Sequence, residues 1–438
     1  MNMSIGGVRT VGALAMVAAV AAAAAGQSPT QEAQAWWRNA ATFKTRYYRV
    51  RTDLPPDAAR MVAGHMDHMC DAYLRMLAAF RISRPSGLEM WLFGSQRSYL
   101  TVIADRYDAN VKGSQGVCIS KGTRITLASW MTERDPEPML QVMQHEGFHQ
   151  FARGAFRSIP PWADEGLAQV FEHGILLDGE VLVGEVPVEW LAMLQAAVKM
   201  NRLRTFDAFM SMENEEWGDH VVGGTAQLNY LQAWGLVHFF LYADNARYQQ
   251  RFMAFLGQLN RGNSWQGAYQ HAFGTRDYAA LQGAFVKYLM ELQPTDLRLT
   301  VYRLKFLAEG AKALAEKDTY PETLEEMREH LTAMAFVHEI HHGRRTLRIS
   351  AKDPSSYAIP LCGGDEAVKF ELLPWETKGK ADDAKSGGWK RGRKRRASST
   401  PDEPLPRRIV TTGLFPRTFR IDWKRDRRGK LSYVLVTD

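Results

Sequence analysis

The chain has 438 residues, of which 45% are hydrophobic and 24% are charged, and its formal net charge is +7. This composition permits a sizeable packed core and is typical of ordinary globular folding, and the length suits two or three domains. The three cysteines, Cys70, Cys118 and Cys362, are too widely spaced for a cysteine-based zinc knuckle. An oxidising compartment would permit one disulfide among them without deciding which pair forms it.

The first 26 residues have the pattern of an export signal. Arg9 supplies a positive charge, residues 11–25 form an apolar stretch, and the alanines before Gly26 offer small residues for cleavage. We therefore expect a signal peptide over 1–26, with an uncleaved anchor as the alternative, and an exported protein that is periplasmic or secreted. No later segment approaches eighteen consecutive apolar residues, so we expect no stable membrane span in the mature chain.

A single domain is predicted over residues 36–292, and it begins with a lobe built on a mixed sheet. The hydrophobic pattern predicts a strand over 47–51, a helix over 57–80, a strand over 88–93 and a hairpin of strands 116–120 and 124–128.

Two consecutive helices follow the hairpin. Asp135 is a suitable N-cap for the first helix, Pro136 suits its first position, and Gly154 suits its C-terminal end. A short loop leads to a second helix over residues 161–173. The chain is then predicted to form a small hairpin and to be mostly helical as far as residue 292, including an amphipathic segment over 226–242.

The first of these helices carries the sequence His-Glu-Gly-Phe-His at residues 145–149, which fits the HExxH zinc signature. Residues four apart share one face of a helix, so the imidazoles of His145 and His149 can reach one ion. Glu146 is rotated by about 100° from His145 and lies at the edge of that position, where it can take a proton from an activated water. A catalytic zinc ion also needs a third protein ligand and an open position for the water.

Glu165 is the first candidate for the third ligand. It lies early in the second helix, and two antiparallel helices joined by a short loop bring that turn back beside the histidines. A carboxylate near a helix N-terminus is also favoured by the helix dipole. Glu172, seven residues later on the same face, is the alternative ligand, and Asp164 and Gln169 are candidates for orienting the histidine rings. The competing interpretation of the motif is a pair of core histidines with a solvent-facing glutamate.

The sequences HEGFHQF and PPWADEGLAQVFE, in this order, resemble the DUF1570 group of bacterial proteins within the peptidase-MA-like gluzincins. The resemblance covers residues 40–290, and it implies a zincin-like α+β fold with a helical C-terminal lobe. It also implies that His145 and His149 bind zinc, that Glu146 is the general base and that Glu165 is the third ligand. Few members of such families have an assigned substrate, so the resemblance implies a reaction class and not a specificity.

Peptide hydrolysis also requires a donor for the oxyanion and a surface for the substrate. Gluzincins commonly use a Tyr or His of the helical lobe as the donor, which points to Tyr230, with His238 as second choice; an ordinary core role for Tyr230 is the alternative. The strand over 124–128 is predicted to be the edge strand with which an extended peptide pairs through main-chain hydrogen bonds. We therefore expect a peptide or protein as the substrate.

A small C-terminal α/β extension is predicted beyond the domain. Residues 296–375 are expected to form an accessory region of charged helices that run to His342, followed by strands from 346–349 onward. Residues 376–406 lack a hydrophobic period and are predicted to be a flexible basic linker, and residues 407–438 a β-hairpin. The basic run within the linker is interpreted as a solvated tether, because nucleic-acid binding conflicts with the export signal.

A second match to HExxH lies at residues 338–342, and we predict that it is not the catalytic site. Its histidines are expected in the final turn of a helix that Gly343 ends, where basic side chains suit the helix dipole. No third ligand follows at a suitable position, because Arg345 stands where a metzincin needs glycine and Asp353 falls in a predicted loop.

These features together predict a zinc-dependent peptidase that uses a metal-activated water with Glu146 as general base, and no nucleic-acid partner. The alternative is a non-catalytic cell-envelope binding protein on a zincin scaffold. The presence of Glu146 between the two histidines favours the enzyme, because a purely structural zinc site does not need that glutamate.

Overall fold

A computed structural model of the chain describes residues 30–80, 82–131, 136–177, 179–342, 345–360, 367–374, 404–413, 418–426 and 429–437. The chain divides into two compact units, an N-terminal unit of residues 1–293 and a C-terminal unit of residues 294–438. The predicted signal peptide, Asp135, Cys362 and the basic run of the predicted linker all lie outside the described residues.

The N-terminal unit begins with a five-stranded mixed sheet whose strand order is β1-β2-β3-β5-β4. The inner pairs β2–β3 and β3–β5 are parallel, whereas β1 and β4 run antiparallel to their neighbours at the two edges. The prediction of a mixed sheet, including its 116–128 hairpin, is therefore confirmed. The strands are β1 (Ala41–Lys44), β2 (Tyr48–Thr52), β3 (Leu88–Phe93), β4 (Gly116–Lys121) and β5 (Arg124–Trp130).

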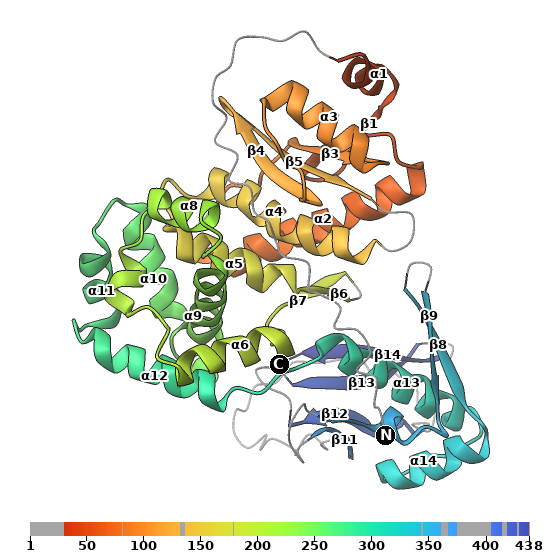
Figure 1. The fold of residues 1–438 in the computed structure, drawn as a ribbon. Coiled ribbons are helices and arrows are strands. Elements are labelled where there is room, and N and C mark those ends of the chain that lie inside the picture. The colour runs from red at the N-terminus through yellow and green to blue at the C-terminus, as the bar shows by residue number, and fades with distance from the viewer. Residues whose placement is uncertain are drawn as a thin grey trace, which may run out of the picture. The chain divides into compact units, whose positions relative to one another are not determined.

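Helices pack on both faces of this sheet (Figure 1). Successive residues of a strand point to opposite faces, so the central strand β3 is buried on both sides: Met90 packs toward α2 and α4, and Trp91 packs toward α1 and α3. The helices α1 and α3 have no counterpart in the sequence prediction. The four helices are α1 (Gln31–Asn39), α2 (Pro56–Met76), α3 (Gln96–Tyr107) and α4 (Glu137–Ala155).

The remainder of the N-terminal unit is mostly helical, as predicted. A two-stranded hairpin, β6 (Ile175–Leu177) and β7 (Glu180–Leu182), follows α5. The helices are α5 (Pro161–Glu172), α6 (Val188–Lys199), α7 (Phe206–Met210), α8 (Asn214–Val222), α9 (Gln227–Ala246), α10 (Gln249–Asn260), α11 (Trp265–Phe273) and α12 (Tyr278–Glu291).

Helix α9 is the centre of this helical part and packs against α5, α6, α10 and α12. The segment 226–242 was expected to be amphipathic, and this is wrong: residues from Leu231 to Leu241 are buried on every side of the helix. A helix that is apolar all round is one that neighbours enclose completely. Gly166 permits α5 to approach the backbone of α9 closely, since a Cβ at this position would lie 2.5 Å from the carbonyl oxygen of Ala233.

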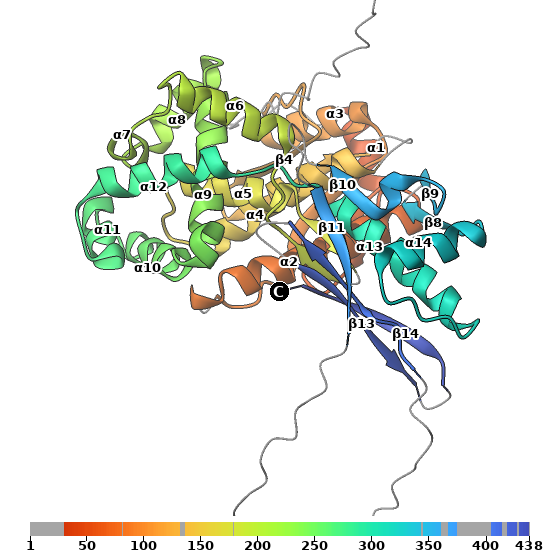
Figure 2. The same ribbon diagram turned by 90° about the horizontal axis from the view of Figure 1, so that it is seen from below.

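The C-terminal unit is built on a five-stranded antiparallel sheet of order β10-β11-β12-β13-β14 (Figure 2). Two helices, α13 (Leu297–Ala315) and α14 (Leu324–Ala333), pack on it, and the hairpin of β8 (Val337–His342) and β9 (Arg345–Ser350) follows them. The sheet strands are β10 (Ala358–Pro360), β11 (Ala367–Leu373), β12 (Arg408–Thr412), β13 (Phe419–Arg425) and β14 (Leu431–Thr437).

Three local predictions are wrong. The charged helices end at Ala333 and do not reach His342, because residues 337–342 pair with β9 as a strand. Gly154 does not end α4, which continues to Ala155 with Phe156 as its extended C-cap. The strand predicted to be the sheet edge, β5, lies between β3 and β4, so β4 is the edge strand. No helix in the described part of the chain is long and apolar enough to cross a membrane.

Candidate metal centre

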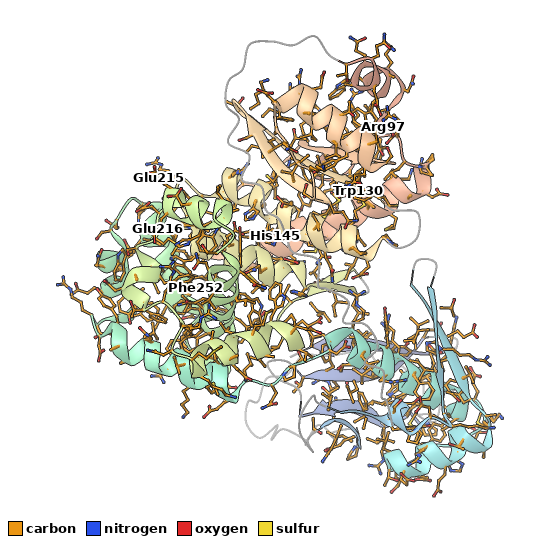
Figure 3. All side chains as sticks on the ribbon, viewed as in Figure 1. Arg97, Trp130, His145, Glu215, Glu216 and Phe252 are labelled. Atoms are coloured by element: carbon orange, nitrogen blue, oxygen red, sulfur yellow. The ribbon has the colours of Figure 1, made fainter. Side chains whose placement is uncertain are left out.

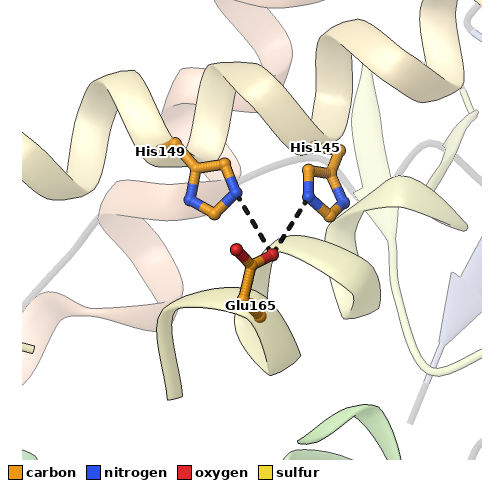
Figure 4. A group of neighbouring side chains, drawn as sticks. All are labelled: His145, His149 and Glu165. Carbon is orange, nitrogen blue, oxygen red and sulfur yellow. Dashed lines mark ion pairs between the residues drawn. The ribbon is translucent and has the colours of Figure 1, made fainter. Parts of the chain in front are cut away.

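Three buried side chains from two helices point toward one another at the centre of the N-terminal unit (Figures 3 and 4). His145 and His149 come from consecutive turns of α4, and Glu165 comes from the first turns of α5, which runs back beside α4. Glu165 Oε2 lies 3.4 Å from His145 Nε2 and 3.5 Å from His149 Nε2. Their possible ligand atoms lie within 4.8 Å of one another, so the three side chains could hold a metal ion.

The facing atoms of this group suit a bound cation. Among the described residues, His145 Nε2, His149 Nε2 and Glu165 Oε2 are buried, lie at ion-pair distance from one another and have no hydrogen-bond partner. Buried polar atoms that lack a hydrogen bond are costly, and such a group in a native fold needs an explanation. Two imidazole nitrogens and one carboxylate oxygen are also the ligands of a catalytic zinc site, which leaves a fourth position open.

The outer nitrogen of each imidazole is held by a carboxylate of α5. His145 Nδ1 lies 2.9 Å from Glu172 Oε2, and His149 Nδ1 lies 3.0 Å from Asp164 Oδ2. Such contacts fix the tautomer and ring orientation of a metal-binding histidine and leave Nε2 available to the metal. Asp164 was predicted for this role and Glu172 as an alternative ligand; in the structure, Glu172 instead contacts the Nδ1 atom of His145.

Charges within the group alter its acid–base properties. Burial alone lowers the pKa of His145, but the carboxylates of Glu165 and Glu172 outweigh burial and raise that pKa to about 9. Burial alone raises the pKa of Glu165, but the nearby His149 and His145 outweigh it and lower the pKa to about 2. Without a metal, the group therefore favours a charged carboxylate that faces two protonated imidazoles, and a bound metal cation would replace the protons on the two Nε2 atoms.

Glu146 lies beside this group and contacts the edge strand. Its Oε2 accepts a hydrogen bond of 2.7 Å from the backbone N–H of Cys118 in β4. Burial raises the pKa of Glu146, whereas His149 and His145 lower it. The carbonyl of Cys118 accepts a hydrogen bond from Arg153, so both backbone groups of Cys118 point away from β5 toward α4. The edge strand and the motif glutamate are thus in direct contact.

Two glutamines that were not predicted as site residues join α4 to its neighbours through hydrogen bonds. Gln144 Nε2 donates to the carbonyls of Phe171, Glu172 and Gly174 at the end of α5, at 2.7, 2.8 and 3.0 Å. Gln150 Nε2 donates to the carbonyls of Glu89 and Ile125 in the sheet. Their position in the sequence could have indicated this role, because both glutamines directly flank the HExxH motif. Both lie in the buried part of α4.

The remaining predicted residues lie in different places. Tyr230 of α9 is half-buried, and the charges of Glu165 and Glu146 both act on its phenol, whose pKa is raised mainly by burial. His238 is engaged elsewhere: Nδ1 lies 2.7 Å from Tyr288 Oη and Nε2 lies 3.3 Å from the carbonyl of Gly184. Among the described residues, the buried Oε1 of Gln169 has no hydrogen-bond partner, so it does not orient His145 or His149.

The second HExxH match does not form a comparable group. Residues 338–342 lie in β8, and a strand rises about 3.3 Å per residue, so its first and last histidine Cα atoms are roughly 13 Å apart. Among the described side chains, the group at His145, His149 and Glu165 is the one with metal-site geometry. The prediction that this match lies in a helix is wrong, and its strand geometry is unsuited to a shared ion.

Comparison with known families supports one part of the resemblance. Residues 140–263 match the family DUF1570. This family is described only as a protein of unknown function. The DUF1570 segment contains both helices of the candidate metal centre, α4 from Leu140 onward and α5, and it extends through α9 and α10. No curated protein gives a significant match to the chain.

Proposed function

We propose that the protein is a zinc-dependent peptidase of the gluzincin type, with His145, His149 and Glu165 as metal ligands. The observation that carries the proposal is the convergence of two imidazole Nε2 atoms and one carboxylate oxygen, all buried and without a hydrogen-bond partner, beside a further carboxylate at Glu146. A structural zinc site is closed by four protein ligands, whereas three ligands with an adjacent acid are typical of hydrolytic sites.

Each side chain has a defined task in this proposal. His145, His149 and Glu165 would hold a zinc ion, which would supply Lewis-acid chemistry for a carbonyl group and for a water nucleophile near neutral pH. The Cys118 N–H holds Glu146 Oε2, which leaves Oε1 to accept the proton of the attacking water and to pass it to the leaving amine. The Tyr230 hydroxyl stays protonated, because burial raises its pKa, and it can donate to the developing oxyanion.

The edge strand supports a peptide as the substrate. β4 has β5 on one side only, and its Cys118 backbone lies against Glu146. The backbone groups of Cys118 itself are taken by Glu146 and Arg153, so an extended peptide would pair with the free side of β4 at the residues that flank Cys118, and it would carry its scissile bond past the general base. Main-chain pairing of this kind binds peptides without requiring one particular side chain.

The metal content and the activity of matched variants test the proposal. The wild-type protein is expected to hold about one zinc ion per chain and to hydrolyse peptides from a mixed library. Glu146→Gln should keep the metal and lose activity by ~10²–10⁴-fold, because a general base contributes about that factor. His149→Ala should lose both, and His271→Ala, at an exposed histidine of α11, should lose neither.

Two results would count against the proposal in different ways. Full activity of Glu146→Gln would exclude the assigned general base. A wild-type protein that binds zinc but hydrolyses no peptide would instead favour the alternative, a non-catalytic binding protein on the same scaffold. Elemental analysis of the purified protein identifies the metal directly and separates zinc from other divalent ions.

A further inference from the structure

The face of the N-terminal sheet that carries α1 and α3 contains a groove that these helices leave open. The groove has a volume of about 570 Å³, and a second hollow of about 380 Å³ shares Arg106 and Arg124 with it, so the two are adjacent. The floor of the larger groove crosses four neighbouring strands, from Thr42 of β1 to Arg124 of β5. The metal-site helix α4 packs on the opposite face of this sheet.

Positive charge dominates the groove. Six basic side chains line the two hollows, against two acidic ones, Glu89 and Asp105. Within the described part of the chain, Arg49 makes an ion pair with Glu89, but no ion pair is formed by Arg38, Arg106 or Arg124, which are exposed. Like charges gathered in one concavity repel one another and focus an electrostatic field on it. The basic residues are Arg38, Arg49, Arg51, Arg106, Lys121 and Arg124.

We infer that this groove binds an acidic polysaccharide, whose carboxylate or sulfate groups meet the arginines. A guanidinium group offers a planar fork of donors that matches such oxyanions. The sugar hydroxyls can at the same time donate hydrogen bonds to Glu89 and Asp105. A polyphosphate has no such donors and would only be repelled by these two carboxylates, so the mixed charge of the groove favours a glycan.

The groove is also poorly suited to two other polyanions. An acidic peptide that adds a strand needs to lie along a sheet edge, whereas this groove runs across the strands. Single-stranded nucleic acid is usually held by bases stacked on free aromatic rings. Here Trp91 is 2% exposed, and the ring of Trp37 is already engaged by the Arg51 guanidinium at 4.8 Å and by Trp91 edge-to-face.

Direct binding measurements on the full chain test the inference. The probes are a heparin-derived hexasaccharide and a hexamer of galacturonate, with neutral dextran, a polyphosphate and a single-stranded oligonucleotide of equal charge beside them. The acidic oligosaccharides should bind, and their affinity should fall as salt rises, because exposed ion pairs are screened. The double variant Arg106→Gln/Arg124→Gln should weaken this binding by about tenfold, since it removes two charged donors from the region where the hollows meet.

A matched control separates the groove from net charge. Arg60→Gln/Arg251→Gln removes the same charge from exposed positions on α2 and α10, outside the groove, and should leave the affinity unchanged. Far-ultraviolet circular dichroism and the melting temperature check that both variants are folded. Equal loss in the two double variants, no binding of either acidic oligosaccharide, or tighter binding of the polyphosphate or the oligonucleotide would overturn the inference. The readout is binding, so it does not depend on the proposed metal chemistry.

Discussion

At the scale of single residues, each histidine of the candidate metal centre has its outer ring nitrogen, Nδ1, in contact with a carboxylate. Glu172 and Asp164 occupy the Nδ1 atoms of His145 and His149, so the Nε2 atoms converge on Glu165. A carboxylate behind an imidazole both orients the ring and makes it a better donor to a metal. This predicts that the two outer carboxylates affect metal affinity although neither lies among the ligands.

The first prediction at this scale concerns Glu172→Gln. The amide keeps the shape of the side chain and one acceptor but removes the charge behind His145, so metal affinity should fall by about 10-fold to 100-fold. Competition with a chelator of known affinity measures the change, and Glu189→Gln, which neutralises an exposed glutamate of α6, is the control. A complete loss of metal would indicate that Glu172 is itself a ligand; an unchanged affinity would remove it from the site.

The sequence alone could predict which residues gather at the site, and less well what each does. His145 and His149 follow from helical spacing, because a helix places residues one turn apart on one face, and Glu146 follows from its place in the HExxH motif. Glu165 and Glu172 lie on one face of α5, and no pattern decides which of them meets Nε2 and which meets Nδ1. That choice depends on how closely two helices pack, which is a property of the tertiary structure.

At the scale of helices, α5 holds the third candidate ligand in place by packing tightly against α9. Gly166, directly after Glu165, lies against the backbone of α9, where a Cβ would approach the Ala233 carbonyl oxygen to 2.5 Å and Val237 Cγ2 to 2.6 Å. A backbone atom cannot rotate away as a side chain can. A larger residue at this position must therefore push α5 away from α9 and carry Glu165 with it.

We therefore predict that Gly166→Ala lowers stability by about 1–3 kcal/mol, the usual cost of overpacking, and also weakens metal binding. Gly154→Ala is the matched control, because it lies in the last turn of α4 with no atom within 4 Å of the added Cβ. Alanine is the better helix former, so that variant should be neutral or more stable by up to about 1 kcal/mol. Urea denaturation compares the two, and equal stability of both variants would contradict the close packing.

The incorrect predictions of helices and strands have identifiable physical causes. Residues 337–342 place histidines four apart, which suits a helix, but pairing with β9 makes the segment a strand, so a non-local contact outweighs the local pattern. The edge strand was predicted wrongly because the order of strands in the sheet differs from their order in the chain. After β3 the chain passes through α3 to β4 at the edge, and β5 then returns between β4 and β3. Tyr99, Val102 and Ile103 of α3 do have helical spacing, so this helix was detectable from the pattern.

At the scale of the whole molecule, each unit has its own buried core. All the residues of the candidate metal centre and its supporting contacts belong to the N-terminal unit. The C-terminal unit buries its own apolar residues, among them Phe306, whose ring lies 5.6 Å from Phe336 and 5.8 Å from Tyr357. Separate cores are the usual basis of separate unfolding transitions.

The last prediction is that removing the metal destabilises one unit and leaves the other unchanged. A ligand that binds only the folded state stabilises it by about 2.7 kcal/mol when its free concentration is one hundred times Kd, and in a domain of this size that raises Tm by roughly 5–10 °C. Calorimetry of the full chain should therefore show two transitions, of which a chelator lowers only one. A chain shortened to residues 27–293 should show that same transition alone, and His149→Ala should make it insensitive to the chelator. If the chelator lowers both transitions, the metal also stabilises the C-terminal unit, and the assignment of the metal to the N-terminal unit alone is wrong.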